Sequence, residues 1–409
     1  MRKVAITGLG VISPVGNDVA TFWNGIKNGV CGVDFITRFD TGEFKVKVAA
    51  EVRGFDPLNY LEKPEARKMD LYCQYAMAAA KQAVEDSGIT GSIDPERLGV
   101  YVGSGIGGMG TFIAETEKLL EKGPRRVSPF FIPMMIGNIA AGNIAIKHGA
   151  KGPSLPVVTA CATSTNAVGE AYRAIKHGYA DAIIAGGAEA TINPLAVAGF
   201  TNCMALSTKT DPAEASIPFD KRRDGFVMGE GAGILVLEEY EHAKARGAKI
   251  YGILCGYGNT CDAYHVTAPH PEAEGAAAAL KLAMGEASYT ESDAVYVNAH
   301  GTSTPLNDKA ETAAIKAAFG AAAKAAYISS TKSMTGHMLG AADAVEAIVS
   351  VLSVKEGVVP PTIGYQEPDE DCDLDYTTGG AVKAPLSVAF SSSLGFGGHN
   401  AVIAIRKDD

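Results

Sequence analysis

The chain has 409 residues, of which 47% are hydrophobic and 20% are charged, and its formal net charge is −10. A chain of this size can bury a large core and is expected to form at least two domain-sized units. The acidic balance argues against a general nucleic-acid binder, whose surface would be basic. Seven cysteines without a CxxC pair predict neither a disulfide framework nor a metal site, and they fit a reducing compartment.

The sequence contains no run of about 20 apolar residues, so no transmembrane helix is expected. Its beginning leads directly into a strand-like run at residues 4–7, without a long apolar segment or a small-residue cleavage site. We therefore predict a cytoplasmic protein without a membrane partner.

The first part of the chain alternates strands with helices. Gly8 and Gly10 are superficially similar to a dinucleotide-binding loop, but the third glycine and the downstream acidic residue of that motif are absent, so no nucleotide cofactor is predicted. A loop at 128–133 is expected to present Phe130 and Phe131 to a cavity or a partner. Strands are expected at 4–7, 98–102, 181–187 and 233–237, helices at 18–27 and 67–87, a glycine-rich turn at 103–108 and a charged loop at 220–230.

The later part of the chain repeats this order of events. The run 157–161, which leads into a helix, is matched by 327–332, and the strand that ends at Gly186 and Gly187 is matched by one that ends at 395–398. Such a repeat predicts two α/β halves with mainly parallel sheets, related by a pseudo-two-fold axis. Strands are expected at 250–256, 294–298, 327–330, 386–391 and 400–405, and helices at 271–287, 306–319 and 339–355.

Three residues that are far apart in the sequence occupy equivalent positions in this pattern. Cys161 lies where an apolar, β-branched run gives way to a helical pattern, so it is expected at a strand-to-helix turn, where unpaired N–H groups favour the thiolate. His300 and His337 each follow another predicted strand, in a glycine-containing turn. A single cysteine or histidine is more often structural, but ligands bind beyond the carboxyl ends of strands, so the three together indicate one reactive site.

Two reaction classes fit these residues. A cysteine hydrolase would use one histidine as its base. In acyl transfer, the thiolate would accept an acyl group while two imidazole N–H groups hold a developing oxyanion. The residues by themselves decide little between the two.

The sequence closely resembles the β-ketoacyl-acyl-carrier-protein synthases over its whole length. The matching segments are 4–14, 159–161, 220–226, 299–304, 332–340 and 395–398. Within that thiolase-fold superfamily, one cysteine with two histidines is typical of the elongating synthases, and Ile106 resembles the type II enzymes rather than type I. The resemblance implies an α/β, thiolase-like five-layered αβαβα sandwich, in which the half 1–249 carries the nucleophile and the half 250–409 carries both histidines.

The resemblance also implies an acyltransferase of fatty-acid synthesis that performs a decarboxylative Claisen condensation. Cys161 would accept the acyl chain from acyl carrier protein, and His300 and His337 would donate Nε2–H bonds to the malonyl thioester oxygen. The backbone N–H groups of Cys161 and Phe396 would hold the second oxyanion. No metal, nucleotide or flavin is implied, because the substrates arrive on the phosphopantetheine of the carrier.

Further roles are implied by the same resemblance. Lys332 is expected to organise the site, with Glu311 and Glu346 as carboxylate partners, because a lone buried cation is costly. Phe396 resembles a gating phenylalanine whose flanking glycines supply backbone freedom. The expected substrate contacts are Thr302 and Thr304 along the phosphopantetheine arm, Ile106 at the acyl pocket, and Phe131, which would close the neighbouring subunit's pocket in a homodimer.

Carrier proteins are acidic, so an acidic synthase is expected to carry a local basic patch. Three residues depart from the family pattern: Leu394 stands where a second phenylalanine is frequent, His399 replaces a threonine of some members, and Met204 stands where a basic residue often contacts the carrier. The candidates for the patch are Lys63, Arg67, Lys68, Arg125, Arg126 and Lys209.

Rival functions stay open at this point. They are a condensing enzyme of polyketide assembly, a non-catalytic chain-length partner subunit and a simple thioesterase. The partner subunit is disfavoured because such subunits lack the cysteine that is present here.

Overall fold

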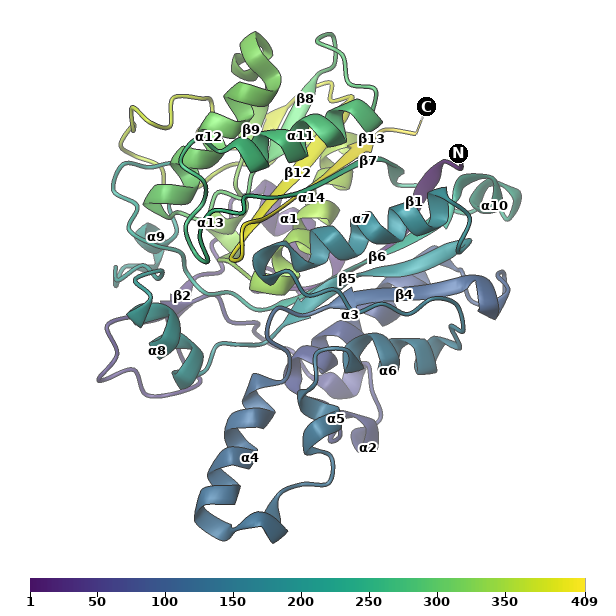
Figure 1. Cartoon of the computed structure of the whole chain (residues 1–409), viewed down its shortest axis with the longest axis vertical. Coiled ribbons are helices and arrows are strands. Elements are labelled where there is room, and N and C mark those ends of the chain that lie inside the picture. Colours follow the sequence, from purple (N-terminus) through teal and green to yellow (C-terminus); the bar gives the residue numbers. More distant parts are fainter. Residues whose placement is uncertain (409) are drawn as a thin grey trace.

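The computed structural model describes residues 1–408 and has five alternating layers of helices and strands (Figure 1). Two layers of strands lie between three layers of helices, which is the predicted αβαβα sandwich. From top to bottom in Figure 1, the helical layers are α11 (Glu274–Glu286) with α12 (Pro305–Phe319), α7 (Thr163–Lys176) with α14 (Ala342–Glu356), and α3 (Leu71–Ser87) with α6 (Ile139–His148).

Both layers of strands belong to one hydrogen-bonded sheet of nine strands, in the order β4-β5-β6-β1-β7-β13-β12-β8-β9. The lower layer contains β1 (Val4–Ile12), β4 (Leu98–Gly103), β5 (Ala182–Glu189) and β6 (Gly231–Glu239). The upper layer contains β7 (Gly252–Cys261), β8 (Val295–Asn298), β9 (Tyr327–Ser329), β12 (Val388–Gly395) and β13 (His399–Arg406).

The sheet has the same plan on each side of the seam where β1 pairs with β7. On one side β4 lies parallel to β5, and on the other β8 lies parallel to β12. Ser154 forms a single parallel bridge with Val100 of β4, in the place where β9 pairs with β8. The strand order therefore repeats, and it brings the ends of β5 and β12 to corresponding places.

The prediction of mainly parallel sheets is wrong. β6 is antiparallel to both of its neighbours, β13 is antiparallel to both of its neighbours, and β1 is antiparallel to β7. All nine residues of β1 are buried. A strand that is covered on both faces reads as a continuous apolar run whatever its direction, so the sequence pattern did not reveal the orientation.

The central layer holds much of the core between the two parts of the sheet. Every residue of α14 from Ala342 to Val354 is buried, because the helix packs against β6 on one side and β12 on the other. In α7, a Cβ atom on Gly169 would lie 2.3 Å from the ring of Tyr257, so only glycine allows this helix to approach β7. The first turns of α7 and α14 lie close together, because the Ala344 N–H donates to the Ser164 hydroxyl at 3.0 Å.

The chain before Cys161 is extended but is not the predicted strand. Residues 155–159 pair with no neighbouring strand, although the Leu155 N–H donates to the Val100 carbonyl at 3.0 Å. Pro153 and Pro156 lack the N–H groups that a continuous ladder with β4 would need. The turn at Cys161 is therefore reached from a single bridge rather than from a full strand.

A helical hairpin projects from the lower end of the molecule in Figure 1. It contains α4 (Met109–Lys122), the short helix η3 (Pro124–Arg126) and α5 (Phe131–Met135). The loop predicted at 128–133 is therefore partly wrong, because α5 begins at Phe131. The large apolar side chains exposed on and beside this hairpin are Ile106, Phe112, Leu119, Leu120, Phe130 and Ile132.

The remaining elements agree broadly with the expected ones. The helix predicted at 18–27 is α1 (Val19–Lys27), where the Asp18 carboxylate caps the N-terminus by accepting the Thr21 N–H. The helix predicted at 67–87 is α3, which begins later than predicted, at Leu71, because Asp70 caps its N-terminus. The short α2 (Lys63–Ala66) precedes it. The other elements are β2 (Asp34–Phe35), β3 (Val48–Ala49), η1 (Pro57–Asn59), η2 (Pro95–Arg97), α8 (Pro194–Asn202), α9 (Pro212–Ala215), α10 (Tyr240–Ala245), η5 (Gly320–Lys324), β10 (Val358–Val359) and β11 (Val382–Lys383). In residues 1–408, no helix combines the length and the apolar character needed to cross a membrane.

Candidate active site

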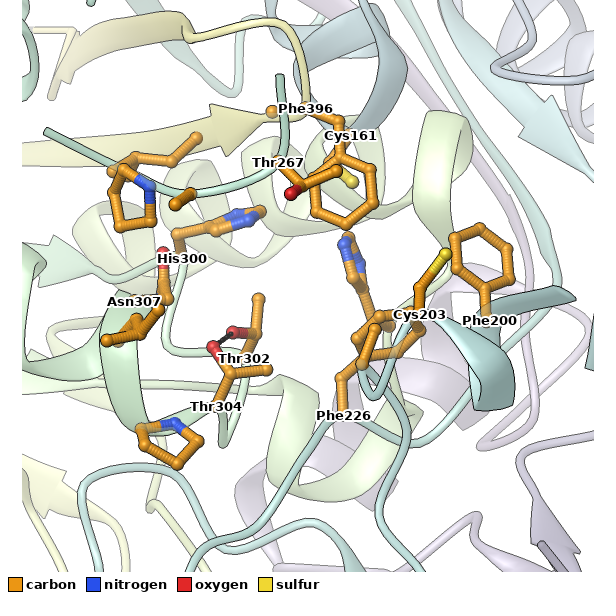
Figure 2. Close-up of a pocket in the computed structure, with 18 of the residues that line it drawn as sticks. Cys161, Phe200, Cys203, Phe226, Thr267, His300, Thr302, Thr304, Asn307 and Phe396 are labelled. Atoms are coloured by element: carbon orange, nitrogen blue, oxygen red, sulfur yellow. Dashed lines mark hydrogen bonds between the residues drawn. The ribbon is translucent and has the colours of Figure 1, made fainter. Parts of the chain in front are cut away.

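Cys161, His300 and His337 line one cavity of about 350 Å³, although they lie on three different turns of the chain. Figure 2 shows Cys161, His300, Thr302, Thr304 and Phe396 around this space. The cavity is also lined by Phe200, Cys203, Met204, Asp224, Phe226, Asp262, Thr267, Asn307 and Leu394. The structure therefore brings the predicted nucleophile and both predicted histidines together.

Cys161 lies in η4 (Ala160–Ala162), a short turn that leads into α7. Ala160 has φ 52°, a left-handed conformation that is strained for a residue with a Cβ atom. The backbone N–H of Phe396, after the end of β12, is directed at the Cys161 thiol. Gly395 makes this approach possible, since a Cβ atom there would lie 2.8 Å from the Thr159 carbonyl oxygen.

The thiol of Cys161 is neutral in the resting protein. Burial raises its pKa to about 12, and the Asp343 carboxyl raises it as well, whereas Lys332 and the Phe396 N–H lower it. The Phe396 N–H thus acts in the expected direction, but desolvation of the anion has the larger effect on the pKa. The proton must therefore leave the sulfur as an acyl group arrives.

His300 follows β8 in a turn that Glu311 holds. The two oxygens of the buried Glu311 carboxylate accept the N–H groups of His300 and Gly301, each at 2.7 Å. Ser392 donates its hydroxyl to the same carboxylate at 2.6 Å. A Cβ atom on Gly301, whose φ is 34°, would lie 2.5 Å from the Cβ atom of Ser330, so glycine is needed for this tight turn.

Glu311 does not pair with Lys332, so that part of the sequence prediction is wrong. Its oxygens are occupied by backbone N–H groups, which satisfy a buried carboxylate as a cation would. Among residues 1–408, the carboxylate that pairs with Lys332 is that of Glu346, at 2.5 Å between Nζ and Oε1. Glu311 supports the site by fixing the His300 turn.

His337 follows α13 (Lys332–Thr335) and is held by its own backbone. Its N–H donates to the Val227 carbonyl at 2.7 Å, and its carbonyl accepts the Gly229 N–H at 2.8 Å. Its ring packs edge-on against the ring of Phe226 at 5.2 Å between centroids. The rings of His337 and His300 are perpendicular, with 5.2 Å between their centroids.

Both imidazoles are neutral at physiological pH. Burial lowers the pKa of His300 and of His337 well below the usual range, and the positive charge of Lys332 lowers both further. Among the atoms that the structure describes, His300 Nδ1 and both ring nitrogens of His337 have no hydrogen-bond partner. Neutral imidazoles of this kind can each donate one N–H to a ligand in the cavity.

A buried charged group accompanies the histidines. Lys332 and Glu346 are only 1% and 2% exposed in their side chains. Asp343, one turn before Glu346 on α14, is fully buried and faces Thr165 and Ser393. Burial raises the pKa of Asp343 and of Glu346, whereas Lys332 lowers both. Lys332 thus lies near two carboxyl groups, Asp343 and Glu346, and burial favours the protonated form of both.

Two family models match the chain, namely "Beta-ketoacyl synthase, N-terminal domain" over residues 1–243 and "Beta-ketoacyl synthase, C-terminal domain" over residues 251–366. The chain belongs to the β-ketoacyl synthase family. It is 52% identical over 407 residues to 3-oxoacyl-[acyl-carrier-protein] synthase 2 of Staphylococcus aureus, which covers 99% of this chain and 98% of that protein. The predicted family, the acyltransferase activity and the condensing function are thus confirmed, and the rival functions are not favoured.

Solved structures of β-ketoacyl synthases agree with the fold. A β-ketoacyl synthase from Burkholderia phymatum superimposes with a TM-score of 0.92 and 35% identity over the whole of both chains. A type II polyketide ketosynthase, solved with its acyl-carrier protein and bound to a hexaketide, superimposes with a TM-score of 0.91 and 36% identity over the same full coverage. The thiolase-like sandwich predicted from the sequence is confirmed.

Of the other predicted site residues, some line the same cavity as Cys161, His300 and His337 and some lie outside it. Thr302 and Thr304 line the cavity of this β-ketoacyl synthase, with their hydroxyl oxygens 2.9 Å apart. Lys332 is not among the residues that line it. Ile106 and Phe131 also lie outside the cavity lining, since Ile106 is 43% exposed and Phe131 packs near Phe112 on the projecting hairpin.

The three departures from the family pattern are distributed unevenly. Met204 is exposed at the cavity, and Leu394 lines it, so each contributes to its shape. His399 begins β13 and is not among the lining residues.

Sequence reasoning missed residues that contribute to the site. Phe200 and Cys203, at the C-terminal end of α8, line the cavity, and neither lies in one of the matched segments. Asp343 was also missed, although a charged residue in the mostly apolar helix 342–354, one turn from Glu346, is a signal that could have drawn attention to it. Among residues 1–408, no group of three or more His, Cys, Asp or Glu side chains is arranged to hold a metal ion.

Proposed function

We propose that this 3-oxoacyl-acyl-carrier-protein synthase performs its reaction through Cys161, His300 and His337. The observation that carries the proposal is their meeting in one cavity, with two neutral imidazoles beside the thiol. In the first step, the sulfur of Cys161 attacks the acyl thioester of the acyl carrier, and the proton of the thiol ends on the released phosphopantetheine thiol. The N–H of Phe396, which is directed at Cys161, and the N–H of Cys161 itself support the oxyanion of this step.

In the second step, malonyl carrier protein enters and loses CO2. The electron pair of the broken bond moves into the thioester, and the enolate oxygen accepts N–H bonds from His300 and His337. Loss of CO2 generates the carbanion without a strong base, so neutral imidazoles suit the step. The carbanion then attacks the acyl group on Cys161, the C–S bond breaks, and the 3-oxoacyl carrier leaves. The released Cys161 thiolate takes up one proton from solvent, which restores the neutral thiol.

Lys332 supports this chemistry from behind the cavity. Its charge lowers the pKa of both histidines, and its pairing with Glu346 keeps it in place. We assign it a positioning role, together with Glu311 at the His300 turn. Thr302 and Thr304 supply the polar wall for the phosphopantetheine arm, and Phe396 acts as the gate at the thiol.

The chain works as a homodimer in this proposal, with the projecting hairpin as part of the interface. Apolar side chains are exposed there, and Leu120 is 80% accessible. Their burial against a second copy of the chain would stabilise the dimer. Phe131 on that hairpin then closes the acyl pocket of the neighbouring subunit beside Ile106. Within each subunit, the halves 1–249 and 250–409 follow the repeated strand order. We assign the protein to the cytoplasm, where thiols stay reduced, because all seven cysteines are free.

A basic face on the lower part of the molecule is proposed to receive the acyl carrier. The Lys68 ammonium lies 5.2 Å from the centre of the Phe130 ring, so α2 and the hairpin adjoin there. Lys209 lies elsewhere, next to Thr208, which donates to Asp224 of the cavity wall. The members of the basic face are Lys63, Arg67, Lys68, Arg125 and Arg126, all exposed.

The function is tested with an acyl carrier and a malonyl carrier labelled at the free carboxyl carbon. We expect one labelled CO2 for each 3-oxoacyl carrier formed. Release of free fatty acid without CO2 would show a hydrolase. Turnover only with a second, different subunit would show a chain-length partner, and turnover only with a dedicated polyketide carrier would place the chain in polyketide assembly.

Charge reversal on the basic face is expected to weaken carrier binding. The triple variant Lys63→Glu, Arg67→Glu, Lys68→Glu should raise KM for both carrier substrates about tenfold at low salt while kcat stays near wild type, because charges outside the reacting centre steer association. The effect should shrink as salt is added. Reversal of the equally exposed Lys244, Lys281 and Lys383 is the matched control. Equal KM values for the two triple variants would show that this basic face does not bind the carrier.

A further inference from the structure

Two similar turns meet at the centre of the molecule, and only one of them carries the nucleophile. The turn η4 leads into α7, and η6 (Leu339–Ala341) leads into α14. The first residue of each is left-handed, with φ 52° at Ala160 and 48° at Leu339. The two turns contact one another. By this correspondence, Gly340 occupies in the second half the position that Cys161 occupies in the first.

The strands that contact these turns also correspond. The end of β12 contacts η4, and the end of β5 contacts η6. After β12, the Phe396 N–H points at Cys161. At the end of β5, the arrangement is reversed, because the Gly340 N–H donates to the Glu189 carboxylate at 3.1 Å. The Gly340 N–H is thus bound by a carboxylate oxygen, whereas the equivalent N–H in the first half, that of Cys161, is proposed to bind the oxyanion of the reaction.

Glu189 is fully buried and binds two separate segments of the chain. One oxygen, Oε1, accepts the Ser104 hydroxyl at 3.0 Å and the Ile106 N–H at 3.3 Å. The other, Oε2, accepts the Gly105 N–H at 2.8 Å as well as that of Gly340. Burial raises the pKa of Glu189 to about 7, against these hydrogen bonds. All four hydrogen bonds have Glu189 as the acceptor, so they fit the ionised carboxylate, whereas a protonated carboxyl would also have to donate a hydrogen bond.

The turn at Gly340 packs tightly against the loop 104–106, with no space for a larger residue at position 340. A Cβ atom on Gly340 would lie 2.3 Å from the Gly105 nitrogen and 2.9 Å from the Glu189 carboxylate. Gly340 is three residues after His337, and the other side of His337 is fixed through Val227 and Gly229. His337 therefore lies between two anchors, one of which is the carboxylate of Glu189.

We propose that Glu189 is a positioning residue that fastens the loop 104–106 to the turn after His337 and so fixes the place of His337 relative to Cys161. The proposal rests on the role given above to His337 in decarboxylation. Cys161 is held by a different contact, through the end of β12. Loss of the Glu189 carboxylate should therefore impair the step that uses His337 more than the acylation of Cys161.

The test measures the two half-reactions separately in full-length variants. For Glu189→Ala, we expect labelled CO2 release from malonyl carrier to fall about 10- to 100-fold, as displacement of a catalytic group by about 1 Å can do. The rate at which an acyl carrier acylates Cys161, followed by intact mass, should stay within about threefold of wild type. Glu189→Gln should recover part of the CO2 release, because its amide oxygen can still accept the Gly105 and Gly340 N–H groups.

The matched control is Glu238→Gln, which changes another buried carboxylate, one that accepts the Thr7 hydroxyl and pairs with Arg246. It should lower the melting temperature without separating the two half-reactions. If Glu189→Ala does not fold, Glu189→Gln decides, and a loss of CO2 release of about threefold or more with normal acylation supports the proposal. Equal losses in both half-reactions, or none, overturn it. Absence of CO2 release by the wild type would instead refute the proposed function itself.

Discussion

Replacement of Cys161 by serine is expected to abolish acyl transfer to the protein and to lower the condensation rate by about 10⁴-fold or more. A serine hydroxyl is a far weaker nucleophile than a cysteine sulfur, and the neighbouring histidines are weak bases for activating it, since both have a pKa well below the usual range. Intact mass after incubation with an acyl carrier should show one acyl group on the wild type and none on Cys161→Ser. Labelled CO2 release from malonyl carrier should continue, because His300 and His337 are unchanged.

The matched control for this experiment is Cys255→Ala. Burial raises the pKa of the Cys255 thiol to about 12, as it does for Cys161, but Cys255 lies in β7 and does not line the cavity. Its variant should be acylated like the wild type. An acyl group found on Cys203, the second thiol of the cavity, or full condensation by Cys161→Ser would contradict the assigned nucleophile.

The second large effect is expected for the histidines. His300→Ala and His337→Ala should each lower labelled CO2 release about 10²–10³-fold, the usual cost of removing one donor from an oxyanion site. The double variant should lose less than the product of the two, because the residues act on one oxygen. Single-turnover release from malonyl carrier measures the step directly. The control is His177→Ala, an exposed histidine at the end of α7, and similar rates for all these variants would refute the assignment.

The acid side of the pH profile follows from the same geometry. The pKa of each imidazole is lowered in the folded protein, so both donors remain neutral below the usual value of about 6.5. Titration of His300 and His337 should therefore add no inflection near pH 6.5 to the profile of CO2 release. In the unfolded chain these histidines bind protons below about pH 6.5 and in the folded chain they do not, so their contribution to the free energy of unfolding should decrease as the pH falls through that value. A histidine inflection near pH 6.5 in the catalytic profile would contradict neutral donors.

The sequence predicted the meeting of Cys161, His300 and His337 because each follows a predicted strand of a repeated pattern, and strand ends define an edge of the sheet. It did not predict how that edge is held. Glu311 and Glu189 bind backbone N–H groups, which every residue but proline has, so no residue type marks their partners in advance. The sequence therefore suggested an ion pair between Glu311 and Lys332, which does not form, and it gave no indication of a role for Glu189. The direction of β6 and β13 was hidden for a related reason, since burial on both faces removes the alternating pattern.

The placement of α7 and α14 between the two parts of the sheet has a consequence for biosynthesis. Contacts such as Thr165 with Ser393, 228 positions apart, and Gly340 with Glu189 form only when nearly all of the polypeptide has left the ribosome. The reactive sulfur then acquires its histidines late, after the slow pairing of distant segments that limits folding in such topologies. A nascent chain is in this way kept chemically inert until its last strands are in place.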